Sequence, residues 1–249
     1  YRFTDALSIS CWVTFGSGLF GTGPQNYKIV DQATSNFNFG YSLFVTKTGS
    51  STTFLRFRIG IGDATVTQAQ IRIDNITDVQ TKKFLILASY NQINGEAQVF
   101  LRGVGVSLTG ADSTPPSDTP IAYSLATNTF CIGNTSPIGS LEFDGSIDEV
   151  GVYNNSLNGA NATELFDWDT NGNLQTYGTG KNIEAWYRMG ENASFVANSD
   201  PAKTGVWTMK NAIALSDTTK NLTSSLTTDP DEGNLPVSAR QSPGIPPPE

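Results

Sequence analysis

Hydrophobic and polar residues alternate in short runs through most of the first two thirds of the chain, which is the pattern of β-strands with one buried face. In LSISCWVTF (residues 7–15), Ile9, Cys11 and Val13 share one face, and Trp12 lies on the other. Similar strand-like runs follow in YSLFVTK (41–47), TFLRFRIGIG (53–62), QIRIDNI (70–76), TNTFCIGN (127–134) and LEFDGSIDEVGVYN (141–154). In the second of these, one face is apolar and the other is mixed, because Phe54 and Arg56 alternate with Leu55 and Phe57.

The clearest single element is a β-hairpin in KKFLILASYNQINGEAQVFLRG (residues 82–103). Two apolar runs flank Asn94-Gly95, and this dipeptide is a strong signal for a tight turn. The segment TGADSTPPSDTP (109–120) is rich in Pro, Ser and Thr and predicts a loop. Strands that recur at short intervals between Gly and Asn turns indicate a two-sheet sandwich.

The pattern changes near residue 157. LNGANATELFDW (157–168) carries its apolar residues at helical spacing, and Asn158 is a plausible N-cap. We therefore expect a β-domain over residues 1–158, a short helix and linker over 159–180, and a C-terminal arm with little regular structure over 181–249. The arm is expected to pack on its own domain or on a neighbouring subunit.

Composition agrees with a β-protein that has many polar turns. Of 249 residues, 38% are hydrophobic and only 15% are charged, and Ser, Thr, Asn and Gly fill the difference. The net charge of −8 argues against a nucleic-acid partner, because phosphate binding needs a basic surface. Insertion into a membrane is not expected, since no apolar run approaches the roughly 20 residues of a membrane helix. We expect residues upstream of Tyr1 to have been removed or to lie outside this sequence.

The chain contains no histidine, which excludes Ser-His-Asp and Cys-His nucleophilic sites and the usual catalytic zinc sites. Cys11 and Cys131 are the only cysteines. Each lies in a strand-like run, so two buried thiols are expected, and a disulfide between neighbouring strands is the alternative.

Several motifs together resemble the laminin G-like, or concanavalin A-like, jelly-roll family. They are SISCWVTF, GYSLFV, ASYNQINGEAQVFLRG, FCIGN and, most specifically, FDGSIDEVGVYNNSL (143–157). The resemblance covers about 160 residues and implies an all-β, two-sheet jelly-roll sandwich followed by the C-terminal extension. The later run EAWYRMGEN (184–192) resembles extensions in structural proteins of tailed phages and suggests a virion setting.

The motif FDGSIDEVGVY raises a question, because two carboxylates, Asp148 and Glu149, stand side by side in a strand that otherwise predicts burial. The resemblance implies that Asp148 helps to bind a structural Ca²⁺, an ion that accepts six to eight oxygen ligands, backbone carbonyls included. The alternative is that Asp148 accepts backbone N–H bonds from a neighbouring loop and that Glu149 faces water. No Asp-x-Asp-x-Asp-Gly loop is present, so any calcium site must be assembled across the fold.

No catalytic residues are assigned. Glycosidases of this fold place carboxylates as Glu-x-Asp-x-x-Glu on one strand. Here Glu142-Phe143-Asp144 begins that pattern, but Ile147 stands where the second Glu is needed. We therefore do not expect an enzyme.

Lectin-type jelly rolls bind sugars with loop carboxylates, Asn side chains and an aromatic ring that stacks on the sugar. The loops GSGLFGTGPQNY (16–27) and DQATSNFNFGY (31–41) combine such residues. The candidate ligand-binding residues are Phe20, Tyr27, Asn36 and Phe37, and the alternative for each is a role in the core or in a turn.

Three functions compete. The first is a virion structural protein of a tailed phage, which would act through contacts with other virion subunits or with copies of itself and could also attach to a host glycan. The second is a carbohydrate-binding lectin module of a secreted or cell-surface protein. The third, a glycoside hydrolase, is disfavoured by the incomplete carboxylate pattern.

Overall fold

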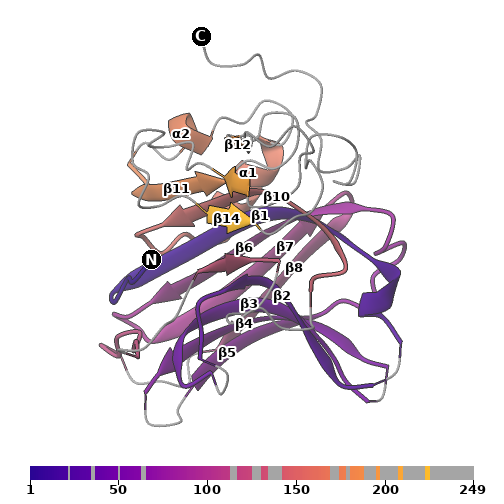
Figure 1. The fold of residues 1–249 in the computed structure, drawn as a ribbon, viewed down its shortest axis with the longest axis horizontal. Helices are drawn as coiled ribbons and strands as arrows, with labels where there is room; N and C mark the ends of the chain where they lie inside the picture. Colours follow the sequence, from indigo (N-terminus) through magenta and orange to yellow (C-terminus); the bar gives the residue numbers. More distant parts are fainter. Residues whose placement is uncertain are drawn as a thin grey trace.

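A computed structural model describes residues 1–21, 23–34, 37–49, 51–62, 66–112, 117–124, 130–133, 142–168, 174–177 and 180–187, together with the backbone of three short strands further on. Figure 1 shows the arrangement of these elements. Every strand pairing in the described part of the chain is antiparallel.

Two sheets form a sandwich. Sheet A has the order β11-β10-β1-β6-β7-β8, with β1 at Ala6–Phe15, β6 at Lys83–Asn91, β7 at Glu96–Gly103, β8 at Val106–Asp112, β10 at Gly145–Tyr153 and β11 at Ile183–Tyr187. Sheet B has the order β5-β4-β3-β2-β9, with β2 at Gln25–Asp31, β3 at Phe39–Lys47, β4 at Thr53–Ile61, β5 at Val66–Arg72 and β9 at Cys131–Ile132. The predicted all-β, concanavalin A-like jelly-roll sandwich is confirmed.

The main core lies between the sheets and follows from the alternation in the sequence. Ile9, Cys11 and Val13 of β1 enter it as predicted, and all three are buried. Leu43 of β3 and Phe57 of β4 face them from sheet B. The hairpin predicted around Asn94-Gly95 joins β6 to β7, and Gly95 adopts a φ of 66°.

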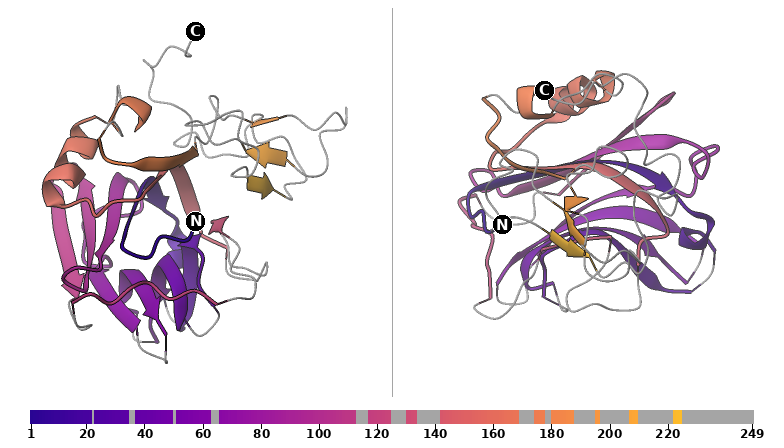
Figure 2. Two further views of the ribbon diagram at one scale, coloured as in Figure 1. Left: turned by 90° about the vertical axis from the view of Figure 1, so that its left-hand side faces the viewer. Right: turned by 45° about the horizontal axis from the view of Figure 1, so that its top comes forward.

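A second hydrophobic cluster covers the other face of sheet A. Helices α1 (Gly159–Asp167) and α2 (Leu174–Tyr177) form a layer over this sheet (Figure 2, right). Leu165 of α1 and Tyr177 of α2 pack there with Trp12. Asn158 caps α1 as predicted, because its side chain accepts hydrogen bonds from the backbone N–H groups of Ala160 and Asn161.

Residues 183–187 belong to the sandwich and not to a separate arm. Strand β11 pairs with β10, and its residues Ala185, Trp186 and Tyr187 are buried. The jelly roll therefore continues beyond the boundary expected at residue 180. Further on, β12 (Phe195–Val196), β13 (Trp207–Met209) and β14 (Leu222–Ser224) form a small three-stranded sheet.

A β-bulge in β10 explains how two adjacent carboxylates fit into a core strand. Ser10 pairs with Gly151 and Trp12 pairs with Asp148, so two residues of β10 lie opposite Cys11 alone. Glu149 at the bulge adopts a φ of 51°. The extra residue shifts the alternation, so that Ile147 and Val150 both face the main core while neither acid does.

Cys11 and Cys131 are not bonded to each other. Cys11 is fully buried in the main core, and burial raises the pKa of its thiol. Cys131 in β9 is half-buried, so only the first thiol lies in the interior as expected. Among the described residues, no helix is long and apolar enough to cross a membrane.

Candidate functional site

The outer face of sheet B carries a regular array of polar and aromatic side chains. Strand pairing aligns them in three rows, namely Asp31, Ser42, Arg58 and Gln68; then Lys28, Phe44, Arg56 and Gln70; then Asn26, Thr46, Phe54 and Arg72. In Figure 1 the strands of sheet B arch across the lower part of the molecule with their ends turned away from sheet A. The outer face therefore lies on the concave side of the sheet.

An aromatic–cation cluster, formed by Phe37, Phe44, Lys28 and Arg58, lies on this face. The ring of Phe37 stacks on that of Phe44, with 5.3 Å between the centroids and 27° between the planes. Lys28 Nζ lies 4.0 Å from the Phe37 centroid, and Arg58 Cζ lies 4.6 Å from it. Phe44 is 1% exposed, whereas Phe37 is half-buried. Phe37 is thus the more exposed aromatic residue of this cluster.

The loop before β3 holds Phe37 in an uncommon conformation. Its φ is 60°, in the left-handed region that residues other than glycine rarely adopt. The backbone N–H of Phe37 donates to the carbonyl oxygen of Thr34 at 2.8 Å. This conformation costs about 1–2 kcal/mol in a residue with a Cβ.

The charges of the cluster are unequally compensated. Lys28 forms a buried ion pair with Asp31 at 2.9 Å and also donates to Ser42. Burial lowers the pKa of Lys28, and the carboxylate of Asp31 opposes this shift. Burial also lowers the pKa of Arg58, and the positive charge of Arg56 adds to the effect. Lys28 is therefore neutralised within the protein, whereas Arg58 faces another cation.

The structure separates the aromatic residues predicted to bind a ligand. Phe37 lies on the outer face of sheet B, whereas Phe20 and Tyr27 pack against the main core. The hydroxyl of Tyr27 donates to the carbonyl oxygen of Gly18 at 3.2 Å, and Lys47 Nζ donates to the same oxygen. Phe20 and Tyr27 thus contact other parts of the same chain, and their role in ligand binding stays a prediction. Asn36 lies outside the described residues.

Both members of the acidic pair accept hydrogen bonds from the protein. Asp148 is 5% exposed, and its Oδ1 accepts from the backbone N–H of Glu149 at 2.8 Å. Glu149 Oε2 accepts from the indole N–H of Trp186, which ties the bulge to β11. In the described part of the chain, no three Asp, Glu, Cys or His side chains lie close enough together to hold a metal ion. A Ca²⁺ at Asp148 would therefore draw most of its oxygen ligands from backbone carbonyls or water.

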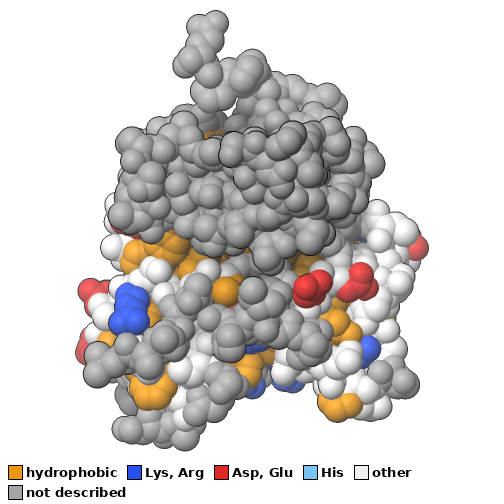
Figure 3. Space-filling model, viewed as in Figure 1, with side chains coloured by type: hydrophobic (Ala, Val, Ile, Leu, Met, Phe, Trp, Pro, Cys, Tyr) orange, Lys and Arg blue, Asp and Glu red, His pale blue; other side chains and the backbone are white. Residues whose placement is uncertain are grey.

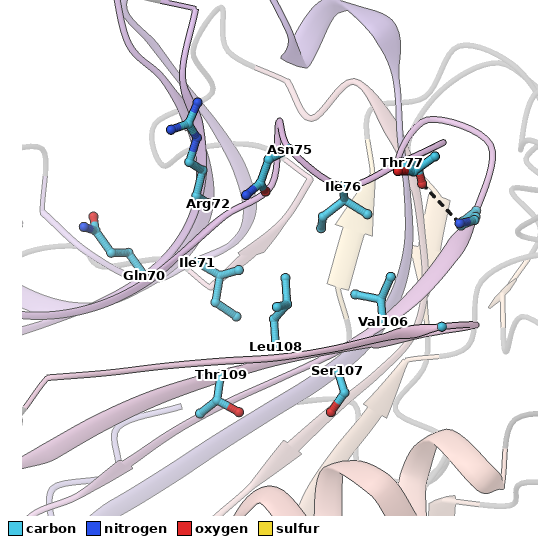
Figure 4. Close-up of a pocket in the computed structure, with 12 residues that line it drawn as sticks. Gln70, Ile71, Arg72, Asn75, Ile76, Thr77, Val106, Ser107, Leu108 and Thr109 are labelled. Carbon is cyan, nitrogen blue, oxygen red and sulfur yellow. Dashed lines mark hydrogen bonds between the residues drawn. The ribbon is translucent and has the colours of Figure 1, made fainter.

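A pocket of about 670 Å³ lies between the edge strands β5 and β8. Figure 4 shows Ile71, Ile76, Val106 and Leu108 directed toward its interior, whereas Arg72 points away from them. The pocket therefore has an apolar interior surrounded by polar residues such as Gln70, Asn75 and Thr109, at the edge of the sandwich. Elsewhere, hydrophobic side chains of described residues form small separate patches on the face seen in Figure 3.

Comparison with known proteins gives distant structural likenesses. No protein-family model matches the chain, and no curated protein matches it. The enzymatically active domain of tailspike protein 2 of bacteriophage CBA120 is 13% identical with a TM-score of 0.47, over 66% of this chain and 25% of that one. A CBM40 of the Ruminococcus gnavus IT-sialidase, bound to α2,3-sialyllactose, is 12% identical with a TM-score of 0.46, over 66% of this chain and 83% of that one.

The LG1–3 region of the laminin α2 chain is 14% identical with a TM-score of 0.39, over 63% of this chain and 30% of that one. This chain thus spans about a quarter of the tailspike chain and less than a third of the laminin chain. The fold assignment rests on the sheet topology described above and not on these likenesses.

Sequence reasoning missed Lys28, Phe44, Arg56 and Arg58 as members of a site. The alternation in TFLRFRIGIG placed both arginines on the mixed face of a strand, which was the available signal. It did not reveal that the Phe37 loop folds over this face, because that contact joins residues in three strands and a turn.

Proposed function

We propose that this chain is a carbohydrate-binding module and that its ligand lies on the outer face of sheet B. The observation that carries the proposal is the aromatic–cation cluster, in which a partly exposed Phe37 ring stacks on the buried Phe44 between two cations. A sugar ring can stack on the exposed surface of such an aromatic ring. The guanidinium and amide groups beside it can donate hydrogen bonds to sugar hydroxyls.

The strained turn at Phe37 supports this proposal. A left-handed backbone persists in a residue with a Cβ only where its surroundings hold it, and such positions cluster at ligand sites. Here the strain places an aromatic ring over a polar sheet face, where it does not add to either hydrophobic core. A ligand-binding role accounts for that placement.

Binding without catalysis is part of the proposal. Asp144, which would be one carboxylate of the glycosidase motif, accepts a hydrogen bond at 2.6 Å from the backbone N–H of Gly18. Its carboxylate thus anchors the loop that contains the short helix η1 (Ser17–Leu19). With Ile147 at the position of the second Glu, the acid and nucleophile pair is not assembled on β10.

The experiment is a glycan array probed with the whole chain and with two variants. Phe37→Ala removes the exposed ring, and we expect affinity to fall about tenfold, equivalent to about 1.4 kcal/mol. Phe166→Ala is the matched control, because Phe166 is also a half-buried aromatic residue but lies near Trp12 on the outer side of sheet A. The proposal would be wrong if the chain bound no glycan, or if Phe37→Ala bound glycans as tightly as the wild-type chain.

For the wider setting, we propose a structural protein of a tailed-phage particle, located in the virion and in contact with copies of itself or with other virion subunits. This proposal rests on the acidic, histidine-free composition and on the resemblance of EAWYRMGEN to extensions of such proteins. The molar mass of the full chain, measured by light scattering, tests it. A high-order assembly supports the virion role, and a monomer favours a lectin module of a secreted or cell-surface protein.

A further inference from the structure

Two neighbouring arginines on the outer face of sheet B have no carboxylate partner among the described residues. Arg56 and Arg58, called here the guanidinium pair, lie two residues apart on β4 and on the same side of the sheet. Their Cα atoms are about 6.6 Å apart along the strand. Each hydrogen-bonds instead to a neutral glutamine on β5, Arg56 to Gln70 and Arg58 to Gln68. On the same face, Lys28 and Arg72 do have carboxylate partners.

The guanidinium pair retains donors that can reach a ligand. Arg58 uses its Nε and Nη2 groups on the single oxygen of Gln68, so its Nη1 end has no acceptor among the described residues. Arg56 uses only its Nε on Gln70, at 3.1 Å. A guanidinium has five N–H donors, and its planar fork matches the two oxygens of a carboxylate or sulfate. Both side chains are half-buried, so they are held in place and remain accessible.

Two arginines without a carboxylate partner are unusual in a protein that carries many acidic residues, if the role of the arginines is to stabilise the fold. The protein carries a net charge of −8, with 23 acidic residues, yet none of the described ones neutralises either arginine. Burial lowers the pKa of Arg56 and of Arg58, and the charge of Arg56 contributes to the lowering at Arg58. The positive charge of Arg56 therefore disfavours the charged form of Arg58, and an anion bound beside the two side chains would oppose this effect.

We infer that the guanidinium pair selects acidic sugars, so that the ligand carries a carboxylate or a sulfate ester beside the ring that stacks on Phe37. This inference rests on the proposed carbohydrate-binding function and names its ligand class. Arg58 connects the two parts of the site, because its Cζ lies 4.6 Å from the Phe37 centroid. The sugar ring lies over Phe37, and its anionic group lies over Arg58 and Arg56.

The test uses the full chain and sets of glycans that differ only in the anionic group. Sialyllactose is compared with lactose, glucuronate oligomers with their carboxyl-reduced forms, and a sulfated oligosaccharide with its desulfated form. We expect at least tenfold tighter binding of the acidic member in the carboxylate sets, the sulfate set, or both. The two kinds of set distinguish a carboxylate from a sulfate ester as the source of the charge.

Arg58→Gln and Arg56→Gln should each lower affinity for the acidic member about 10- to 100-fold. Affinity for the neutral member should fall by a smaller factor, so that the preference for the acidic member decreases in both variants. Arg72→Gln is the matched control, since it removes the same charge from the same face but from a side chain that Asp74 already neutralises at 2.8 Å. Melting curves verify that each variant is folded.

The outcomes separate the two proposals. Equal binding of acidic and neutral members, with loss in Phe37→Ala, keeps the carbohydrate-binding function and overturns the acidic specificity. A preference for acidic glycans that survives in both arginine variants overturns the assignment to this pair. If no glycan binds, both proposals are wrong.

Discussion

Ending the chain after Gly180 is expected to unfold the sandwich, whereas ending it after Tyr187 is not. The shorter chain lacks β11, whose Trp186 and Tyr187 are 4% and 0% exposed. Each of these aromatic side chains buries about 150–250 Å², worth about 4–6 kcal/mol at about 25 cal/mol per Å². Together they represent an upper estimate of about 8–12 kcal/mol. This is comparable to the whole stability of a typical domain, about 5–15 kcal/mol.

The assay is urea unfolding of the two truncated chains, followed by circular dichroism. We expect one cooperative transition for residues 1–187 and none for residues 1–180. Trp186→Ala in the full chain isolates part of the effect and should cost about 3–5 kcal/mol. If residues 1–180 unfold cooperatively at the same urea concentration as residues 1–187, then β11 is not part of the folding unit and this account of sheet A is wrong.

Three further predictions concern close packing, pH and metal. Gly110→Ala should destabilise the protein by several kcal/mol, because the added Cβ would lie 2.1 Å from the carbonyl oxygen of Gln70. Gly49→Ala is the control, because the space around Gly49 is open, and it should be neutral in the same urea assay. Burial raises the pKa of Tyr90 to about 12, which is above its value of about 10 in the unfolded chain. The contribution of Tyr90 to stability is therefore complete below pH 10 and is lost as pH rises through 12. Tyrosinate absorbance should increase together with unfolding over this range. If Ca²⁺ binds at Asp148 as predicted, its addition to chelator-treated protein should raise the melting temperature, and Asp148→Asn should abolish that rise. An unchanged melting temperature of the wild-type protein would show that no Ca²⁺ acts at Asp148.

The strands and the capped helix could be predicted from the sequence because each depends on local pattern. Alternation places Ile9 and Val13 in the core, and Asn158 precedes a run with helical spacing. Strand β11 could not be assigned to the sandwich in this way. It pairs with β10, from which two helices separate it along the chain. A run of five residues carries no signal of such a distant partner.

The bulge shows a second limit of local pattern. Strict alternation would place Ile147 and Val150 on opposite faces, but the residue inserted at Glu149 puts both in the core. The adjacent acids are therefore accommodated by backbone geometry. Their sequence also gave no reason to expect the bond between Glu149 and Trp186, because Trp186 belongs to the strand that was assigned to the arm.

The two sheets differ in how their outer faces are used, and this difference accounts for the position of the candidate site. Sheet A is covered by α1 and α2, whose apolar residues pack on Trp12, so its outer face contributes to stability. The outer face of sheet B belongs to neither hydrophobic cluster and carries four cations, one carboxylate and three amides in its aligned rows. Burial there brings little hydrophobic stabilisation and costs desolvation of charge. The two unneutralised arginines are therefore better explained by binding an anionic ligand than by holding the fold together.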